Sequence, residues 1–176
     1  MNTPIEIRIG TPNDAVPLTD LAIRTMRAAF GPPHNPADVV DAYIKNSFSV
    51  EQMQQELNDP KNTFLLAVDS DSSLIGYAKL RRIRPPRQLQ GQRAIEIQRL
   101  YVAETQIGRG LGRQLMERCW QEAQLAGYPV VWLGVWERNE RAIGFYKQMG
   151  FERCGWHYFQ FGPERQRDFW MKKDVV

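Results

Sequence analysis

The stretch QIGRGLGRQLMERCW, residues 106–120, places three glycines within five residues, immediately before a run with helical periodicity. The segment ahead of it, AIEIQRLYV at residues 94–102, predicts a strand. After the glycines, one apolar face predicts a helix that ends near Ala126 and carries Leu111, Leu115, Cys119, Ala123 and Ala126. A turn that feeds a helix exposes the first backbone N–H groups, where the helix dipole favours an anion. The segment therefore predicts either a phosphate-binding loop or a tight turn that needs glycine for geometry alone.

Around this stretch, periodicity and turn residues predict an alternation of strands and helices along the whole chain. The other predicted strands are residues 5–9, 63–69, 74–83, 130–135, 151–161 and 166–173. The other predicted helices are residues 12–29, 36–46, one that starts at Ser49, and 139–150, with Thr11, Asn35 and Ser49 as N-caps. Adjacent prolines in RPPRQLQGQR, residues 84–93, exclude regular structure there. No linker is visible, so residues 1–176 are predicted to form one domain, a mixed α/β sheet covered by helices.

Composition excludes several classes of protein. A net charge of +3 on 176 residues allows an anionic ligand but is too small for a nucleic-acid-binding surface. No apolar run is long enough to span a membrane, and MNTPIEIRIG has no signal-peptide features, so we expect a cytoplasmic protein. Cys119 and Cys154 show no metal-ligand spacing, so no metal is expected.

Two common phosphate-binding motifs do not match the glycine stretch. A P-loop needs Gly-Lys-Ser/Thr, which does not occur in the sequence. The dinucleotide-binding fingerprint needs G-x-G-x-x-G in the first turn of a doubly wound sheet, whereas these glycines have a different third spacing and lie late in the chain. A nucleotide-binding module is therefore the weakest of the alternatives.

A third pattern fits: the segment resembles the pyrophosphate loop of the GNAT superfamily of N-acetyltransferases, which reads Gln/Arg-x-x-Gly-x-Gly/Ala. Gly110 and Gly112 occupy the two glycine positions, while Ile107 stands in the Gln/Arg position with Gln106 one residue early. A second segment, WERNERAIGFYKQMGF at residues 136–151, is similar to the C-terminal motif of that family. Its matching residues are Asn139, Ala142, Phe145, Tyr146, Gly150 and Phe151.

The resemblance implies the GNAT fold, a mixed, mostly antiparallel sheet flanked by helices with two splayed central strands. It also implies acetyl-coenzyme A as co-substrate, with its pyrophosphate in the glycine loop and its pantetheine arm between the splayed strands. The cofactor-binding residues that it implies are Leu100, Tyr101, Val102, Ile107, Gly108, Arg109, Gly110, Leu111, Gly112, Arg113 and Asn139. An amide from Tyr101 is the expected oxyanion donor. Asn139 is also a candidate helix N-cap, and both roles are compatible.

The same resemblance points to two catalytic groups. Glu96 lies on the strand at residues 94–102, with Gln98, Leu100 and Val102 expected on its face. It is a candidate base for the amine, or for the water that deprotonates it, and the alternative is an ion pair with Arg81 or Arg99. Tyr146 matches the family residue that protonates the leaving thiolate, and its alternative is packing on a helix face.

The sequence determines the acceptor less well than the fold or the cofactor. The C-terminal segments, with Asp168 in the last strand, resemble bacterial spermidine/spermine acetyltransferases, and Asp38, Asp41 and Glu96 could supply carboxylates to a polyamine groove. A peptide or protein N-terminus ranks second, and a non-catalytic acyl-CoA sensor is a further alternative. His34 is expected at the surface and His157 as a packed residue, and a homodimer is allowed.

Overall fold

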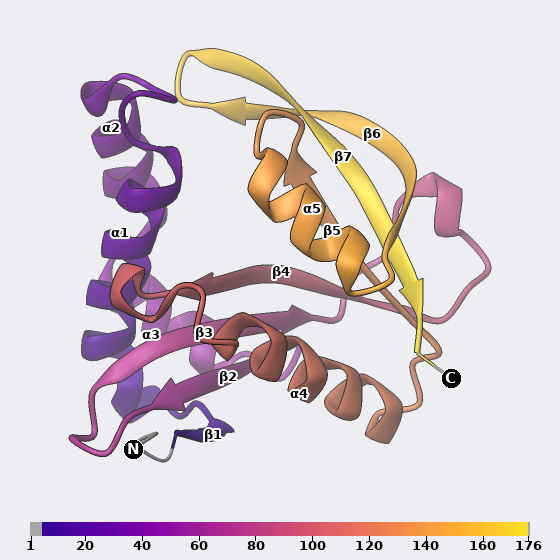
Figure 1. Ribbon diagram of the computed structural model, residues 1–176, viewed down its shortest axis with the longest axis horizontal. Coiled ribbons are helices and arrows are strands. Elements are labelled where there is room, and N and C mark those ends of the chain that lie inside the picture. The colour runs from indigo at the N-terminus through magenta and orange to yellow at the C-terminus, as the bar shows by residue number, and fades with distance from the viewer. Residues whose placement is uncertain (1–4, 176) are drawn as a thin grey trace.

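Seven strands form one sheet in the computed structural model, which describes residues 5–175 (Figure 1). The strands are β1 (Glu6–Ile9), β2 (Asn62–Val68), β3 (Leu74–Arg81), β4 (Ala94–Val102), β5 (Val130–Trp136), β6 (Glu152–Phe161) and β7 (Glu164–Asp174). They lie in the order β1-β2-β3-β4-β5-β7-β6, and the pair β4–β5 is parallel while the other pairs are antiparallel. Residues 1–4 and 176 of the predicted domain, including the first residues of MNTPIEIRIG, lie outside the described residues.

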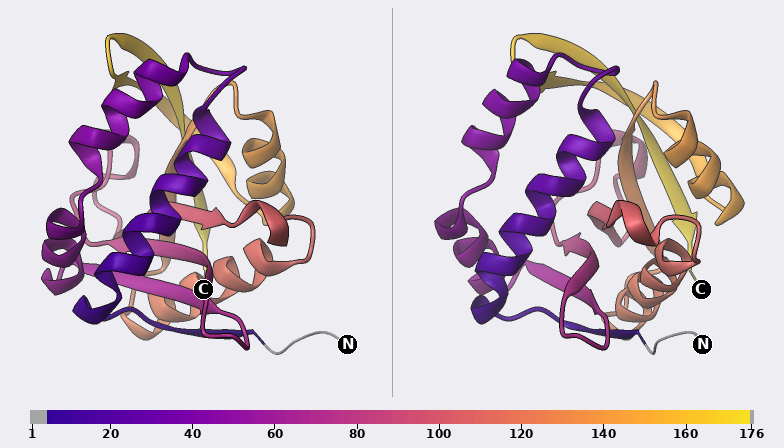
Figure 2. Two further views of the ribbon diagram at one scale, coloured as in Figure 1. Left: turned by 90° about the vertical axis from the view of Figure 1, so that its left-hand side faces the viewer. Right: turned by 60° about the vertical axis from the view of Figure 1, so that its left-hand side comes forward.

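Helices cover both faces of this sheet. They are α1 (Ala15–Phe30), α2 (Ala37–Ser47), α3 (Val50–Asn58), α4 (Leu111–Leu125) and α5 (Glu140–Gln148). Figure 2 shows α1, α2 and α3 grouped on one face, with α4 and α5 on the other. We call these the α1 face and the α4 face. The predicted fold class, a mostly antiparallel mixed sheet flanked by helices, is confirmed.

Three short 3-10 helices were not predicted. They are η1 (Pro12–Asp14), η2 (Arg87–Leu89) and η3 (Glu104–Gln106). The expectation of no regular structure at residues 84–93 is therefore wrong over one turn, because the prolines precede that turn, where their missing N–H groups cost no hydrogen bond.

The predicted cap at Asn35 is also wrong. Pro36 is the N-cap of α2, whereas the buried Asn35 side chain donates to the carbonyl of Phe30 at 2.8 Å and accepts from Gln166 Nε2 at 2.8 Å. A buried side-chain amide needs an acceptor for its nitrogen and a donor for its oxygen, and Phe30 and Gln166 supply them. The Ser49 cap is confirmed, since Ser49 Oγ accepts from the Gln52 N–H at 3.1 Å.

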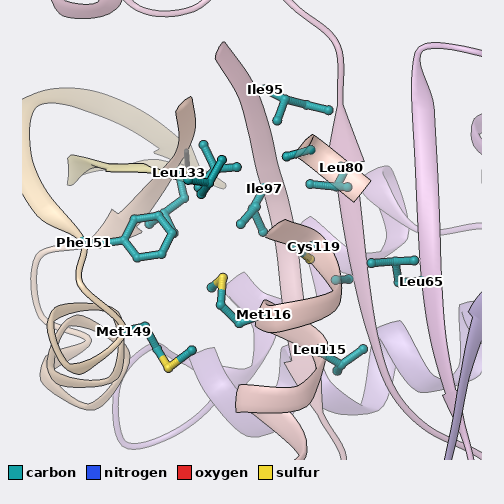
Figure 3. Close-up of a cluster of buried hydrophobic side chains, with 14 of the residues drawn as sticks. Leu65, Leu80, Ile95, Ile97, Leu115, Met116, Cys119, Leu133, Met149 and Phe151 are labelled. Carbon is teal, nitrogen blue, oxygen red and sulfur yellow. The ribbon is translucent and has the colours of Figure 1, made fainter. Parts of the chain in front are cut away.

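Two hydrophobic clusters fix the sheet between the helices. On the α4 face, Met116 and Cys119 of α4 meet Ile97 of β4 and Leu133 of β5 (Figure 3). On the α1 face, Leu18 and Leu21 are among the residues that pack with Phe64 and Tyr77. Where β4 borders β5, Ile95 belongs to the α4-face cluster, and Ala94 packs in a third, smaller cluster with Leu89, Val130 and Trp132.

Candidate active site

Strands β4 and β5 begin side by side and then separate. Their register contains three pairs, which are Ala94 with Val130, Ile95 with Val131, and Glu96 with Trp132. Beyond these pairs β4 runs on to Val102 and β5 to Trp136 without pairing to each other, as the diverging ribbons show (Figure 1). The expected splay is confirmed. Backbone N–H and C=O groups on the inner edges past this point need partners other than a strand, which an amide-containing ligand arm can supply.

A β-bulge in β4 decides which side chains face which way. The register with β3 jumps from Lys79–Arg99 to Leu80–Ile97, so Gln98 is an extra residue. Beyond the bulge, Leu100 and Val102 pack on the α4 face together with Ile97. Glu96 alternates with Ile95 and Ile97 and therefore points to the α1 face. The expectation that Glu96 shares a face with Leu100 and Val102 is wrong, because the inserted Gln98 reverses the alternation beyond it.

The glycine loop has the conformation that its composition predicts. Gly108 and Gly110 adopt φ values of +81° and +82°, and a Cβ added to either would meet nothing within 4 Å. Backbone conformation rather than crowding therefore requires glycine at both positions. Gly112 has no such constraint, and a Cβ there would contact the Phe145 ring at 3.6 Å.

The loop leaves the start of α4 open. Gly110 is the N-cap and offers no side chain, and the first α-helical hydrogen bond runs from the Gln114 N–H to the Gly110 carbonyl at 3.1 Å. The N–H groups of residues 111–113 thus precede the helical ladder. Arg109 and Arg113 are exposed beside them, and Ile107 is 39% exposed, while Leu111 is buried and anchors the turn. This arrangement can receive a phosphate or diphosphate.

Glu96 is in an ion pair on the α1 face. Its Oε2 accepts from Arg81 Nε at 2.6 Å, and the glutamate side chain is 8% exposed against 31% for the arginine. Of the two partners considered from the sequence, Arg81 is therefore the observed one. Arg99 instead donates to both carboxylate oxygens of Glu56, which also accepts from the buried Lys79 at 2.7 Å.

Tyr146 lies on the α4 face, opposite Glu96. Its ring packs against Phe145 at 5.5 Å and Phe151 at 5.7 Å between centroids. Burial, and then the neighbouring Cys119 thiol, raise the pKa of Tyr146, so the phenol stays protonated. The pKa of Tyr101 is also raised. Burial is the largest cause, followed by the neighbouring Tyr77 and then by Tyr146. A protonated phenol near the splay can donate a proton to a leaving group.

Asn139 caps α5. Its Oδ1 accepts from the Ala142 N–H at 3.2 Å, which is the N-cap hydrogen bond considered in the sequence analysis. The Asn139 amide nitrogen is on the same terminus, so the cap leaves a donor for a second partner.

The structure brings together His157, which the sequence analysis assigned to packing, and Asp168, which it named only in the resemblance to polyamine acetyltransferases. The His157 ring does pack, as predicted, because it stacks on Trp170 at 3.7 Å and 11°. Its Nδ1 lies 3.0 Å from the Tyr158 carbonyl, and its Nε2 lies 3.9 Å from Asp168 Oδ2. No local pattern could show this contact, because it depends on the pairing that brings Asp168 of β7 opposite His157 of β6.

The carboxylates expected around a polyamine groove are mostly paired with arginine. Asp41 accepts from Arg27 at 3.1 Å, and Glu96 from Arg81. Asp38 is exposed in the first turn of α2. Next to the α1–α2 loop, a cavity of about 250 Å³ is lined by both signs of charge, from Glu137, Arg138, Glu164, Arg165 and Arg167.

Within residues 5–175 no group of three or more His, Cys, Asp or Glu side chains is arranged to hold a metal ion. The same part of the chain contains no helix with the length and apolar character needed to cross a bilayer.

A glycine loop at the start of a helix, beside a splayed pair of parallel strands, is the arrangement that the sequence resemblance predicted. The chain belongs to the acetyltransferase (GNAT) family, whose model matches residues 23–151. It is 32% identical over 152 residues to an uncharacterized N-acetyltransferase of Lactobacillus delbrueckii subsp. lactis, covering 86% of this chain and 87% of the relative. It is 30% identical over 163 residues to an uncharacterized N-acetyltransferase of Mycobacterium tuberculosis, covering 93% of this chain and 99% of the relative.

Among solved structures, the fold matches the PaiA N-acetyltransferase from Thermoplasma acidophilum in complex with coenzyme A. The TM-score is 0.79 at 22% identity, and the match covers 97% of this chain and 99% of that one. The family uses acetyl-coenzyme A, so the expected co-substrate is confirmed at the level of the family.

Proposed function

We propose that this protein transfers the acetyl group of acetyl-coenzyme A to a primary amine by direct attack in a ternary complex. The observation that carries the proposal is the separation of β4 from β5, which starts after the Glu96–Trp132 pair. The open N-terminus of α4 lies beyond the far end of β4. Acetyl-coenzyme A supplies the acetyl group and a thiol leaving group. The protein would hold it, exclude water and move protons on either side.

The residues present fit that ligand. The left-handed Gly110 leaves the N–H groups of residues 111–113 open to pyrophosphate, with Gly108, Arg109 and Arg113 around them and Ile107 on the rim. Backbone groups of Leu100 and Val102 border the splay, where the pantetheine amides would bind. Asn139 would contact the same arm through its amide nitrogen. The Tyr101 amide does not fit the oxyanion-donor role that the resemblance implied, because it faces β3 in the same direction as the Ala103 N–H, which donates to the Ile75 carbonyl at 2.9 Å.

Two side chains on opposite faces would support the chemistry. Tyr146, protonated and on the α4 face, would give a proton to the departing thiolate. Glu96, on the α1 face, is held by Arg81, and this pairing suits ordering of water and acceptor better than direct proton removal.

The charge pattern favours an acceptor with few positive charges, such as a peptide N-terminus or an amino acid, over a polyamine. The carboxylates Asp41, Glu56 and Glu96 are already neutralised by basic side chains, and in the cavity beside Trp136 the two glutamates are accompanied by three arginines, Arg138, Arg165 and Arg167. Part of the chain is 32% identical over 103 residues to the N-alpha-acetyltransferase RimI of M. tuberculosis, covering 57% of this chain and 59% of that protein. A spermidine N-acetyltransferase chimera shares the fold with a TM-score of 0.70 at 19% identity.

Initial-rate kinetics test the proposal. Thiol release from acetyl-coenzyme A would be followed with a short neutral peptide, free amino acids and spermidine as acceptors. We expect turnover with the peptide or amino acid, and intersecting double-reciprocal lines, because direct attack needs both substrates bound. Parallel lines would contradict direct attack. Tight cofactor binding with no turnover would support the sensor alternative.

A further inference from the structure

Gly134 leaves β5 without a side chain on the α1 face, close to where β5 separates from β4. Gly134 is exposed in a strand whose other six residues are buried, and it lies two residues past the last β4–β5 pair. A Cβ on Gly134 would meet Trp170 Cζ3 at 3.0 Å and His157 Nε2 at 3.6 Å. The missing side chain therefore leaves His157 Nε2 directly over β5 at the start of the splay.

The hydrogen bond on the other ring nitrogen fixes the form of His157. The Tyr158 carbonyl, 3.0 Å from Nδ1, can only accept, so Nδ1 carries the hydrogen. In the neutral ring Nε2 then keeps its lone pair. Stacking on Trp170 at 3.7 Å holds the plane of the ring, and the side chain is 29% exposed, so Nε2 can reach a ligand.

Charged side chains lie on β7, at the end of β5 and on β4. Asp168 on β7 is nearest, with Oδ2 3.9 Å from Nε2, beyond a hydrogen bond but close enough to stabilise an imidazolium. Glu137 at the end of β5 is paired with Arg167, and Glu96 on β4 with Arg81. The 3-10 helix η2 places the uncharged Gln88 beside Gly155 of β6.

The protonation states suit a proton acceptor at neutral pH. Burial lowers the pKa of His157, and the Tyr158 hydrogen bond acts weakly in the other direction. Burial, and then the charge of Glu137, raise the pKa of Asp168 to about 6. At pH 7 the histidine is therefore neutral and Asp168 is mostly ionised.

We propose that His157 Nε2 accepts the proton of the acceptor amine, with Asp168 as a positioning residue that stabilises the imidazolium. The amine nitrogen forms the amide C–N bond, the thioester C–S bond breaks, the amine proton moves to His157, and Tyr146 gives its proton to the sulfur. The two proton transfers thus take place on opposite faces of the sheet. This inference rests on the proposed acetyl transfer.

The test combines NMR with the pH dependence of kcat. The chain has two histidines, so His34→Gln identifies the His157 imidazole signals in the free protein. We expect an Nδ1-protonated ring whose titration midpoint, below its ordinary value, matches the acid limb of kcat. His157→Gln should remove that limb and lower kcat by about 100-fold. Asp168→Asn should move both midpoints to lower pH, because a negative charge beside the imidazolium is lost.

Controls separate this inference from the proposed function. Trp156→Gln changes the opposite face of the same strand, and it should keep the wild-type pH profile. Active wild-type protein together with an unimpaired His157→Gln would overturn the role of His157 alone. If His157→Gln does not fold, an NMR midpoint that disagrees with the kinetic one would still overturn it. Wild-type protein that acetylates no amine would overturn the proposed function, and the role of His157 with it.

Discussion

Gly110→Asp should separate cofactor binding from stability. The residue has φ +82° and a Cβ there meets nothing within 4 Å, so the cost to the fold is backbone strain of about 1–2 kcal/mol. A carboxylate at the N-terminus of α4 returns about 0.3–1 kcal/mol through the helix dipole. The free energy of unfolding should therefore fall by less than about 2 kcal/mol, and Tm by less than about 8 °C.

Binding of acetyl-coenzyme A should respond far more strongly. Two like charges at about 4 Å repel by about 4 kcal/mol at an effective dielectric constant near 20, which corresponds to roughly 1000-fold in Kd. Titration calorimetry would measure Kd, and a thermal melt would measure stability. Gly91→Asp is the matched control, because Gly91 has φ +86° and the same empty surroundings but does not begin a helix. Equal affinity in the two variants would refute the assignment of the phosphate to this loop.

Three further substitutions test the neighbouring groups. Tyr146→Phe should lower kcat by about 100-fold with Kd for acetyl-coenzyme A unchanged; wild-type kcat would make Tyr146 a packing residue. Glu96→Gln should lower the free energy of unfolding, measured in a urea melt, by about 2 kcal/mol, because it weakens the pair with Arg81. The pH profile of kcat should keep its shape, and loss of its acid limb would make Glu96 the base. Asp168→Asn should raise Tm above pH 6, because the folded pKa of about 6 lies above the unfolded value of 3.8 and ionisation then opposes folding. That gain should disappear as the pH falls from 6 towards 4, and a gain independent of pH would contradict the burial of a charged Asp168.

Local sequence patterns were sufficient to predict most of the helices and strands and the glycine loop. Periodicity located α4 and the strands around it, and the glycines required by positive φ, Gly108 and Gly110, fall inside the predicted loop. The face of the sheet on which each β4 side chain lies could not be predicted, because the bulge at Gln98 is defined only by pairing with β3. The choice of Arg81 over Arg99 as partner of Glu96 depends on that bulge.

The acceptor side of the site was even less accessible from the sequence. The contact of His157 with Asp168 depends on the pairing of β6 with β7, and its approach to Gly134 on how β7 pairs with β5. These are contacts between strands whose register no local pattern specifies. The buried Asn35 illustrates the same limit, because its partner Gln166 is far away in the chain.

The most direct test uses acetyl-coenzyme A labelled with a heavy isotope in the acetyl group, mixed with the protein, a neutral peptide, a free amino acid and spermidine. Mass spectrometry would locate the label, while calorimetry on the same preparation confirms cofactor binding. We expect label on an amine nitrogen, with more on the peptide or amino acid than on spermidine. Intact cofactor binding with no label on any amine would contradict it.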